Sequence, residues 1–337
     1  MSQADIRALI QAEMRAAFPE AEARVAEFYA MQQYQLGWRD ETLAPANVDP
    51  GKLLRPYLTL LACQAAGGDA RQALPLAAAI QLIHDFSLIH DDIEDNSDTR
   101  RGRPTVWKLW GLAQGINTGD GMFTVAHLAL HRLSAAGLPA ELVLEVLKRF
   151  DQTILTICEG QFLDLRFEGN LAISEADYLA MISRKTAALI AAAAGLGALV
   201  GGASASAARA MFDYGQNLGL AFQVQDDVLG IWGDPEVTGK PFAADIYRRK
   251  LSLPVIHALG AAEARGQLAQ LYGQPEVGDA AARQILDILG QAGSREYTED
   301  VAAHYHRQAL SALGSLPDSA PVAEIRAITQ RLLGRAF

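Results

Sequence analysis

Two clusters of acidic side chains, far apart in the chain, could do chemistry in this sequence. The first is H-D-D-I-E-D at residues 90–95, and the second is F-Q-V-Q-D-D at residues 222–227. Both end stretches in which apolar residues recur at helical spacing. Carboxylates near an apolar core repel one another and desolvate badly unless a cation neutralises them. Because Mg²⁺ commonly binds through a few carboxylates and substrate phosphates, the clusters predict a metal-assisted site for a phosphorylated substrate.

The spacing inside the first cluster supports this interpretation. Asp91 and Asp95 are four residues apart, so on a helix they share a face, one turn apart. Alone they would repel mildly, whereas a cation between them would make a chelating edge. Asp92 points to another side of the helix. A solvated acidic helix end would also explain one such cluster, but the second cluster, with Asp226, favours metal binding.

Basic side chains accompany both clusters. Lys52 and Arg55 precede Pro56 at the expected start of a helix, where free N–H groups also attract phosphate. His84 lies two helical turns before Asp91, on nearly the same face. The other cations that flank the two clusters are Arg100, Arg101, Lys185, Lys240 and Lys250. Each alone could be an ordinary surface charge, but together they favour the binding of two anionic substrates.

The composition excludes several classes of protein. The 337 residues are 50% hydrophobic, and 39 acidic against 29 basic side chains give a net charge of −10, which argues against a nucleic-acid partner. Cys63 and Cys158 are too few for a disulfide framework and lack zinc-site spacing, so a reducing cytoplasm is the expected location. The first residues have no basic-then-apolar signal pattern.

The elements that must position these residues are predicted to be helices. Apolar periodicity is helical nearly throughout, and no sustained period-2 alternation suggests a sheet. No linker or repeat divides the chain, so we expect one all-α domain over residues 1–337. The uncharged run 187–203 approaches membrane-spanning length, but its many Ala and Gly residues favour a buried core helix. The expected helices cover residues 3–17, 20–36, 52–66, 73–96, 118–135, 139–167, 175–200, 204–229, 251–263, 279–291, 296–313 and 320–334.

With these motifs in order, the sequence resembles the trans-isoprenyl diphosphate synthases, the polyprenyl synthetase family. The resemblance covers roughly Gly51 to the C-terminus. It implies an all-α fold of the isoprenoid synthase type, with about ten or more helices around a central apolar cavity. The motifs that carry it are G-K-L-L-R-P at 51–56, I-H-D-F-S-L-I-H-D-D-I-E-D at 83–95, R-R-G-R-P-T at 100–105, K-T at 185–186, F-Q-V-Q-D-D at 222–227, G-D-P-E-V-T-G-K at 233–240 and R-R-K-L-S-L-P at 248–254.

The resemblance also implies a role for individual residues. Three Mg²⁺ ions, bound with an allylic diphosphate, would be held by Asp91, Asp95 and Asp226. That diphosphate would also contact Arg100, Lys185, Lys240 and Lys250. The diphosphate of isopentenyl diphosphate would be held by Lys52, Arg55, His84 and Arg101. Oxygens that favour a developing cation on the allylic carbons would come from Thr186 and Gln223. The wall that stops the growing chain would be formed by Phe86 beside the small Ser87.

The implied activity is condensation of isopentenyl diphosphate with an allylic diphosphate, with loss of diphosphate, in a homodimer. A single bulky aromatic at Phe86 favours the twenty-carbon geranylgeranyl product, with farnesyl or longer polyprenyl synthesis as alternatives. A class I terpene cyclase would use the same metal chemistry but needs no isopentenyl site, and a non-catalytic partner subunit would lack the metal ligands.

The sequence departs from the family's pattern at a few positions. Pro50 and Leu53 replace a Gly and an Arg of the usual G-G-K-R-x-R-P segment. Gly230 stands where the second acidic motif usually has a third Asp, which puts an outer contact of that motif in question. Ala244 replaces the glycine that usually precedes Asp245.

Overall fold

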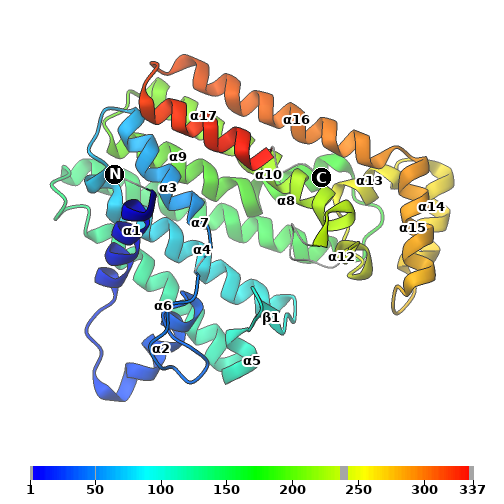
Figure 1. The fold of residues 1–337 in the computed structure, drawn as a ribbon, viewed down its shortest axis with the longest axis horizontal. Helices are drawn as coiled ribbons and strands as arrows, with labels where there is room; N and C mark the ends of the chain where they lie inside the picture. The colour runs from blue at the N-terminus through cyan, green and yellow to red at the C-terminus, as the bar shows by residue number, and fades with distance from the viewer. Residues whose placement is uncertain (1–2, 50, 236–241, 334–337) are drawn as a thin grey trace. The chain divides into compact units, whose positions relative to one another are not determined.

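The computed structural model describes residues 3–49, 51–235 and 242–333, and helices make up most of this part of the chain (Figure 1). Within the described residues, the only strands are β1 (Thr99–Arg100) and β2 (Arg103–Pro104), which pair antiparallel as a short hairpin. The predicted all-α fold is therefore confirmed.

The chain divides into two compact units. One consists of residues 1–150 and 193–208, and the other of residues 151–192 and 209–337. The single domain expected over residues 1–337 stays a prediction. Three helices run from one set of residues into the other: α7 (Ala140–Phe167), α9 (Ala188–Val200) and α10 (Ala205–Trp232).

The first unit is built around α4 (Leu74–Glu94), which contacts helices on several sides (Figure 1). Its first half is almost completely buried, and the small side chains of Ala77, Ala78 and Ala79 let neighbouring helices approach closely. Its acidic C-terminal turn, by contrast, is only partly buried. The other elements of this unit are α1 (Gln3–Ala17), η1 (Ala23–Val25), α2 (Ala26–Gln35), α3 (Leu54–Ala65), η2 (Ala70–Ala73), α5 (Val106–Trp110) and α6 (Leu112–His131).

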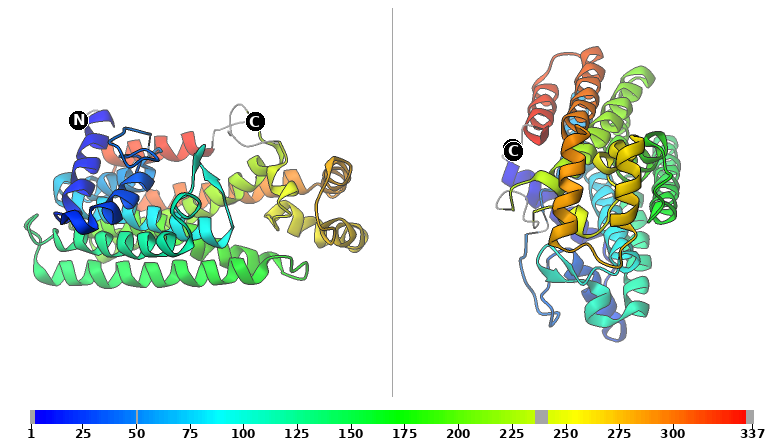
Figure 2. Two further views of the ribbon diagram at one scale, coloured as in Figure 1. Left: turned by 90° about the horizontal axis from the view of Figure 1, so that it is seen from below. Right: turned by 90° about the vertical axis from the view of Figure 1, so that its right-hand side faces the viewer.

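The second unit has a core around the short helix α13 (Leu253–Leu259), whose Leu253, Val255 and Ala258 are fully buried. This helix packs against α8, α14, α15 and α16, and Figure 2 shows α14 and α15 side by side. The remaining elements are α8 (Glu175–Ile182), the π-helical turn η3 (Ser183–Ala187), α12 (Ala244–Tyr247), α14 (Ala262–Tyr272), α15 (Asp279–Gln291), α16 (Ser294–Ala312), η4 (Leu313–Ser315) and α17 (Ala320–Leu333).

Several elements differ from the sequence-based prediction, and three of the differences bear on the second unit or on the hairpin. The helix expected over 251–263 ends at Leu259, and a separate helix, α14, begins at Ala262. Helix α14 was not predicted because its largely polar sequence shows little apolar periodicity. The helix expected over 175–200 is interrupted by η3. The hairpin was missed because strands of two residues are too short for alternation to be visible.

Two helical stretches are long and apolar enough to cross a membrane by length and composition, namely 70–94 and 175–200. In the protein, 67% and 61% of their most apolar windows is buried. Core helices of globular proteins pass the same test, so these stretches are weak evidence for a span. The buried run from Ala187 to Val200 agrees with the expected core helix.

Candidate active site

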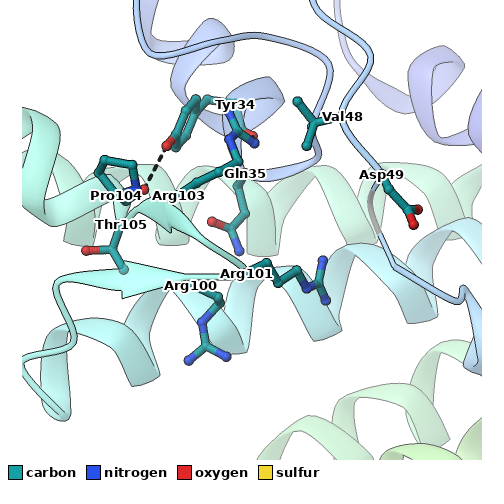
Figure 3. A pocket seen from close by; sticks show the side chains of 10 residues that line it. Tyr34, Gln35, Val48, Asp49, Arg100, Arg101, Arg103, Pro104 and Thr105 are labelled. Atoms are coloured by element: carbon teal, nitrogen blue, oxygen red, sulfur yellow. Dashed lines mark hydrogen bonds between the residues drawn. The ribbon is translucent and has the colours of Figure 1, made fainter. Parts of the chain in front are cut away.

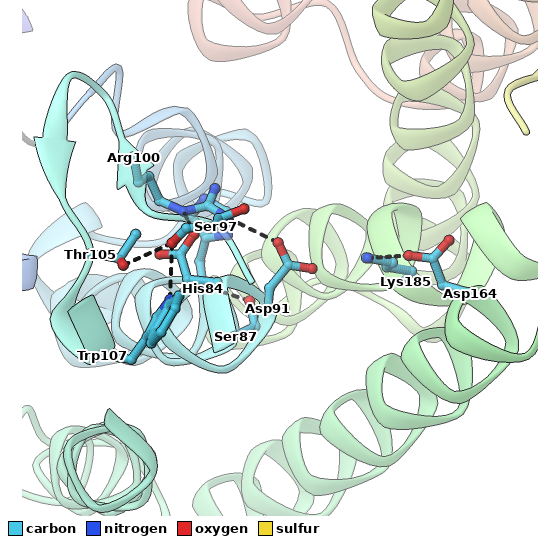
Figure 4. A network of polar contacts seen from close by, with 10 residues as sticks. His84, Ser87, Asp91, Ser97, Arg100, Thr105, Trp107, Asp164 and Lys185 are labelled. Carbon is cyan, nitrogen blue, oxygen red and sulfur yellow. Dashed lines mark hydrogen bonds and ion pairs between the residues drawn. The ribbon is translucent and has the colours of Figure 1, made fainter. Parts of the chain in front are cut away.

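In the first unit, the first acidic cluster lies at the C-terminal end of α4. Asp91 is partly buried, Asp92 is buried, and Asp95 is the exposed C-cap residue. Arg100 clamps two of them, because its Nε donates to Asp92 Oδ1 at 2.7 Å and its Nη2 donates to Asp91 Oδ2 at 3.0 Å (Figure 4). Burial raises the pKa of Asp92 to about 6, although Arg100 counteracts this shift. The cluster is therefore a set of carboxylate oxygens that is already paired with one cation, Arg100.

The hairpin gives Arg100 and Arg101 different directions. Arg101 and Gly102 form its turn with φ of 53° and 75°, the left-handed conformation that glycine adopts at no steric cost. Arg100 leaves the hairpin on one side and Arg101 on another (Figure 3). The motif R-R-G thus supplies a turn residue as well as two cations.

The next part of the same motif fastens the hairpin to α2. The guanidinium of Arg103 lies 3.9 Å from the centre of the Tyr34 ring and donates to the carbonyl oxygens of Tyr34 and Arg39. The Tyr34 hydroxyl donates to the carbonyl oxygen of Pro104 at 2.7 Å (Figure 3). Sequence reasoning gave Arg103 no role. These contacts make it the residue that holds the hairpin in position.

A second group of cations lies beside this cluster in the first unit. Arg55 Nη1 is 3.4 Å from His84 Nε2, and Arg55 Nε is buried with no hydrogen-bond partner among the described residues. Burial lowers the pKa of Arg55 to about 10, so the guanidinium stays charged at neutral pH. Burial, with Arg55 and Arg101 nearby, holds the pKa of His84 well below its usual value, so its imidazole is neutral. A partly buried guanidinium with an unsatisfied N–H is a ready partner for an anion.

Arg101 and Lys52 complete this group through the loop before α3. Gly51 has a φ of 96°, and a Cβ built there would lie 3.4 Å from Arg101 Cζ, so the guanidinium lies against this glycine. Lys52, the next residue, is exposed. Leu53, which replaces the family's usual Arg, also adopts a left-handed φ of 47° and is buried as the N-cap residue of α3. The four predicted isopentenyl ligands therefore belong to one region of the first unit.

Sequence reasoning missed the buried carboxylate of Asp85. It is 2% exposed and accepts a hydrogen bond of 2.8 Å from the amide of Gln81, one turn earlier on α4. Burial raises its pKa to about 6, against the opposing effects of Gln81, Arg101 and Arg55. Asp85 is therefore a buried counter-charge to the cation group.

In the second unit, Asp226 and Asp227 follow each other on α10 but have different environments. Asp226 is half-buried, whereas Asp227 is completely buried. The Tyr178 hydroxyl and the Leu253 N–H both donate to Asp227 Oδ2, the latter at 3.1 Å. Gln223 Nε2 donates to Asp227 Oδ1 at 3.3 Å. Burial raises the pKa of Asp227 to about 6, although nearby Lys250 and the Tyr178 hydrogen bond lower it.

The π-helical turn η3 carries the K-T motif. A Cβ built on Gly160 of α7 would lie 2.2 Å from the Lys185 backbone nitrogen, so only glycine permits this close approach. Lys185 pairs with Asp164, which the sequence did not single out (Figure 4). The Thr186 hydroxyl donates to Gln223 Oε1 at 3.0 Å. Such π-helical turns are frequent at functional sites because they redirect side chains.

Lys250 belongs to the same acidic surroundings. Its Nζ lies 4.0 Å from Asp227 Oδ1. Although partial desolvation lowers the pKa of Lys250, whose side chain is 43% exposed, the negative charges of Asp227 and Asp245 raise it above the usual value. Lys240 and Pro50 lie outside the described residues.

The two remaining departures from the family pattern lie together. A Cβ built on Gly230 would be 2.2 Å from Asp245 Oδ2, so this carboxylate occupies the space of a side chain at position 230. Ala244 is the first residue of α12, and the left-handed φ of 56° belongs to Ala243 before it.

The chain-length candidates lie on α4, before the acidic cluster. The Phe86 ring packs edge-on against His90 and Phe123, with ring centroids 4.8 Å and 5.4 Å apart. The Ser87 hydroxyl donates to the carbonyl oxygen of His84 at 2.8 Å. Phe86 is thus packed in a row of rings between His90 and Phe123.

In the described part of the chain, no three His, Cys, Asp or Glu side chains come together as a ready metal site. Mg²⁺ typically binds protein through one or two carboxylates and takes its other ligands from water and phosphate, so pairs of aspartates fit it. All the candidate ligands are carboxylate oxygens, the donors that hard cations prefer.

A family model and several relatives match most of this chain. A sequence model of the polyprenyl synthetase family matches residues 40–289. The chain is 39% identical to a geranylgeranyl diphosphate synthase of Mycobacterium tuberculosis over 90% of its length and 86% of the relative. It is 36% identical to a (2E,6E)-farnesyl diphosphate synthase of Mycobacterium bovis, over 90% of this chain and 84% of that one. It is similar to the crystal structure of a polyprenyl synthetase from Streptomyces coelicolor, with a TM-score of 0.89, 33% identity and 98% of both chains covered.

Proposed function

Since this chain belongs to the polyprenyl synthetase family and is a prenyl-transferring enzyme, we propose that its product is geranylgeranyl diphosphate, made by joining isopentenyl diphosphate to an allylic diphosphate. One observation supports the proposal that the enzyme binds two diphosphate substrates and not one. The partly buried Arg55, whose Nε is buried and unsatisfied, lies beside the neutral His84. A class I terpene cyclase has no need for an anion site of this kind.

We propose Asp91, Asp95 and Asp226 as the ligands of Mg²⁺. When bound, Mg²⁺ neutralises the charge that builds up on the departing diphosphate. Lys185, Lys240 and Lys250 hold that same diphosphate, and Arg100 does so while it stays paired with the first acidic cluster. Lys52, Arg55, His84 and Arg101 hold isopentenyl diphosphate.

The remaining roles belong to neutral side chains. Thr186 and Gln223 present oxygens to the allylic carbon as it becomes positive, which lowers the barrier because these dipoles are already in place. An apolar cavity accepts the growing chain and excludes water, which would otherwise trap the cation.

The test is incubation of the purified protein with Mg²⁺, isopentenyl diphosphate and one allylic primer at a time. We expect linear products that end at twenty carbons. Cyclic products formed from an allylic diphosphate alone would show a terpene cyclase instead. An inactive chain that becomes active only with another subunit would show a partner role.

Phe86→Ala is expected to lengthen the product by at least one isoprene unit. Removing the ring would open the wall of the chain pocket next to Phe123. Chromatography of the dephosphorylated products measures the length. Phe18→Ala is the matched control, because it removes a ring of the same size from a different aromatic cluster, with Tyr29 and Trp38. Equal product lengths in both variants would mean that another side chain sets the limit.

We also propose a cytoplasmic homodimer. Helix α7 carries an exposed apolar stripe, in which Leu144, Leu155 and Phe162 are 65%, 63% and 60% exposed. Their spacings of eleven and seven residues are close to whole numbers of helical turns, so they lie on one face. A second copy of the chain would cover this face, since association of identical chains buries the same surface on both. With only two cysteines, Cys63 and Cys158, too few for a disulfide framework, the chain suits a reducing compartment.

Phe162→Glu is expected to weaken this dimer, because it places a charge on the apolar stripe. Light scattering after gel filtration should then report one 36.2 kDa chain in place of two. Val25→Glu is the control, since Val25 is also exposed, at 46%, but lies outside α7. A dimer that persists unchanged in Phe162→Glu at low micromolar concentration would contradict the assignment of this face.

A further inference from the structure

A continuous chain of hydrogen bonds in the second unit ends at the two residues proposed to face the allylic carbon. Tyr178 of α8 donates to Asp227, Gln223 donates to the other oxygen of Asp227, and Thr186 donates to Gln223. Tyr178 is 1% exposed and Asp227 is fully buried, so solvent cannot replace the contact between these two residues. Two of the links, Tyr178 to Asp227 and Thr186 to Gln223, join residues 49 and 37 positions apart, so they depend on the tertiary structure, whereas the link from Gln223 to Asp227 lies within α10.

The donor and acceptor groups of each hydrogen bond determine the direction of the next one. An ionised carboxylate only accepts hydrogen bonds, so Gln223 must turn its NH₂ group toward Asp227 and its carbonyl oxygen toward Thr186. The Thr186 hydroxyl then points its proton at that carbonyl oxygen. Its lone pairs are left free for a positive charge that develops nearby.

The orientation of the carboxylate itself depends on Tyr178. Asp227 Oδ2 accepts from the Tyr178 hydroxyl and from the Leu253 N–H, and these two donors hold the carboxylate from one side. Without the phenol, one lone pair of a fully buried carboxylate would lose its partner, and the group would turn toward the remaining donors.

We propose that Tyr178 is a positioning residue for prenyl transfer, acting through Asp227 to orient the Gln223 amide and the Thr186 hydroxyl. The proposal rests on the proposed function, because it assumes that Thr186 and Gln223 face the allylic carbon. Tyr178 itself touches no substrate. Its role is to hold two dipoles in the orientation that stabilises positive charge, so that no reorganisation is needed during the reaction.

Tyr178→Phe removes one oxygen atom and tests this role. We expect kcat to fall about tenfold, the effect of losing one buried hydrogen bond to a charged group, while KM for both diphosphates stays within about twofold. Tyr214→Phe is a closely matched control in the same unit. Tyr214 is equally buried, and its hydroxyl bonds Thr329 at 2.8 Å, in place of a site carboxylate. It should lower the melting temperature, because a buried hydrogen bond is lost, and leave kcat unchanged.

A double-mutant cycle separates failure of this inference from failure of the proposed function. If Tyr178 acts through Thr186, then Tyr178→Phe combined with Thr186→Val should reduce kcat little more than Thr186→Val alone. A loss of kcat in Thr186→Val but none in Tyr178→Phe overturns the positioning role and leaves the function intact. Full activity in Thr186→Val overturns the assignment of Thr186 itself.

If Tyr178→Phe does not fold, Asp227→Asn provides an alternative test of the proposal. Asn retains one carbonyl oxygen, which cannot satisfy the donors on both sides of the native carboxylate, so the Gln223 amide should lose its fixed orientation. We expect kcat to fall, and the loss should again be non-additive with Thr186→Val. Additive losses would show that Asp227 and Thr186 act independently, and the proposal would then be wrong.

Discussion

Asp91→Ala and Asp226→Ala are each expected to lower kcat by about a thousandfold, because each removes several kcal/mol of charge stabilisation from the departing diphosphate. Asp91 shares a helix face with Asp95 and is held by Arg100, whereas Asp226 lies half-buried on α10. Asp95→Ala should behave in the same way. Steady-state rates with saturating substrates and a titration of Mg²⁺ measure the effect, and the Mg²⁺ requirement should shift to higher concentration.

Two aspartates outside the predicted site serve as controls. One follows α4 in the chain, and the other lies on α10. Asp98 is exposed and pairs with Lys108 at 3.0 Å, while Asp213 is exposed on α10 and pairs with Arg209. Their replacement by Ala should leave kcat within about twofold, since exposed ion pairs contribute little. If the site variants kept wild-type activity, the metal assignment would be untenable.

Arg55→Ala is expected to raise KM for isopentenyl diphosphate about 30-fold or more, because losing a buried charged partner of an anion costs about 2 kcal/mol or more. KM for the allylic substrate should change little. Arg55→Lys should recover only part of the loss, since an ammonium lacks the fork of donors that matches a diphosphate. Initial rates with one substrate varied at a time separate the two constants.

Arg71→Ala is the control for this experiment, because Arg71 is an exposed arginine of the same unit. It should leave both Michaelis constants unchanged. An effect of Arg55→Ala confined to the allylic substrate would show that the two anion sites have been exchanged in our assignment.

In the hairpin, the sequence motif was predicted, but the contacts of its individual residues were not. The sequence R-R-G-R-P marked Arg100 and Arg101 as cations for substrates. In the structure, Arg100 is also the clamp of the first acidic cluster, and Arg103 fastens the hairpin to Tyr34. No periodicity reveals a two-residue strand, and the direction in which each arginine points depends on the turn between them.

The sequence by itself determined the helical fold and the chemistry of the acidic clusters. Helical spacing is a local property, so the placement of Asp91 and Asp95 on one face follows from their separation alone. The same holds for the order of the motifs, which indicated the family before any contact was known. Long segments with clear helical periodicity, such as α1 and α7, were also predicted with nearly their observed bounds for this reason.

Only the tertiary structure decided which of these groups have partners and which are buried. Tyr178 meets Asp227 across 49 residues, and Lys185 meets Asp164 across 21. Asp85 looks like any polar residue of a helix until the packing around α4 excludes water from it. Burial and pairing set pKa values and side-chain orientations, and both depend on which distant segments pack together, a property that no spacing along the chain encodes.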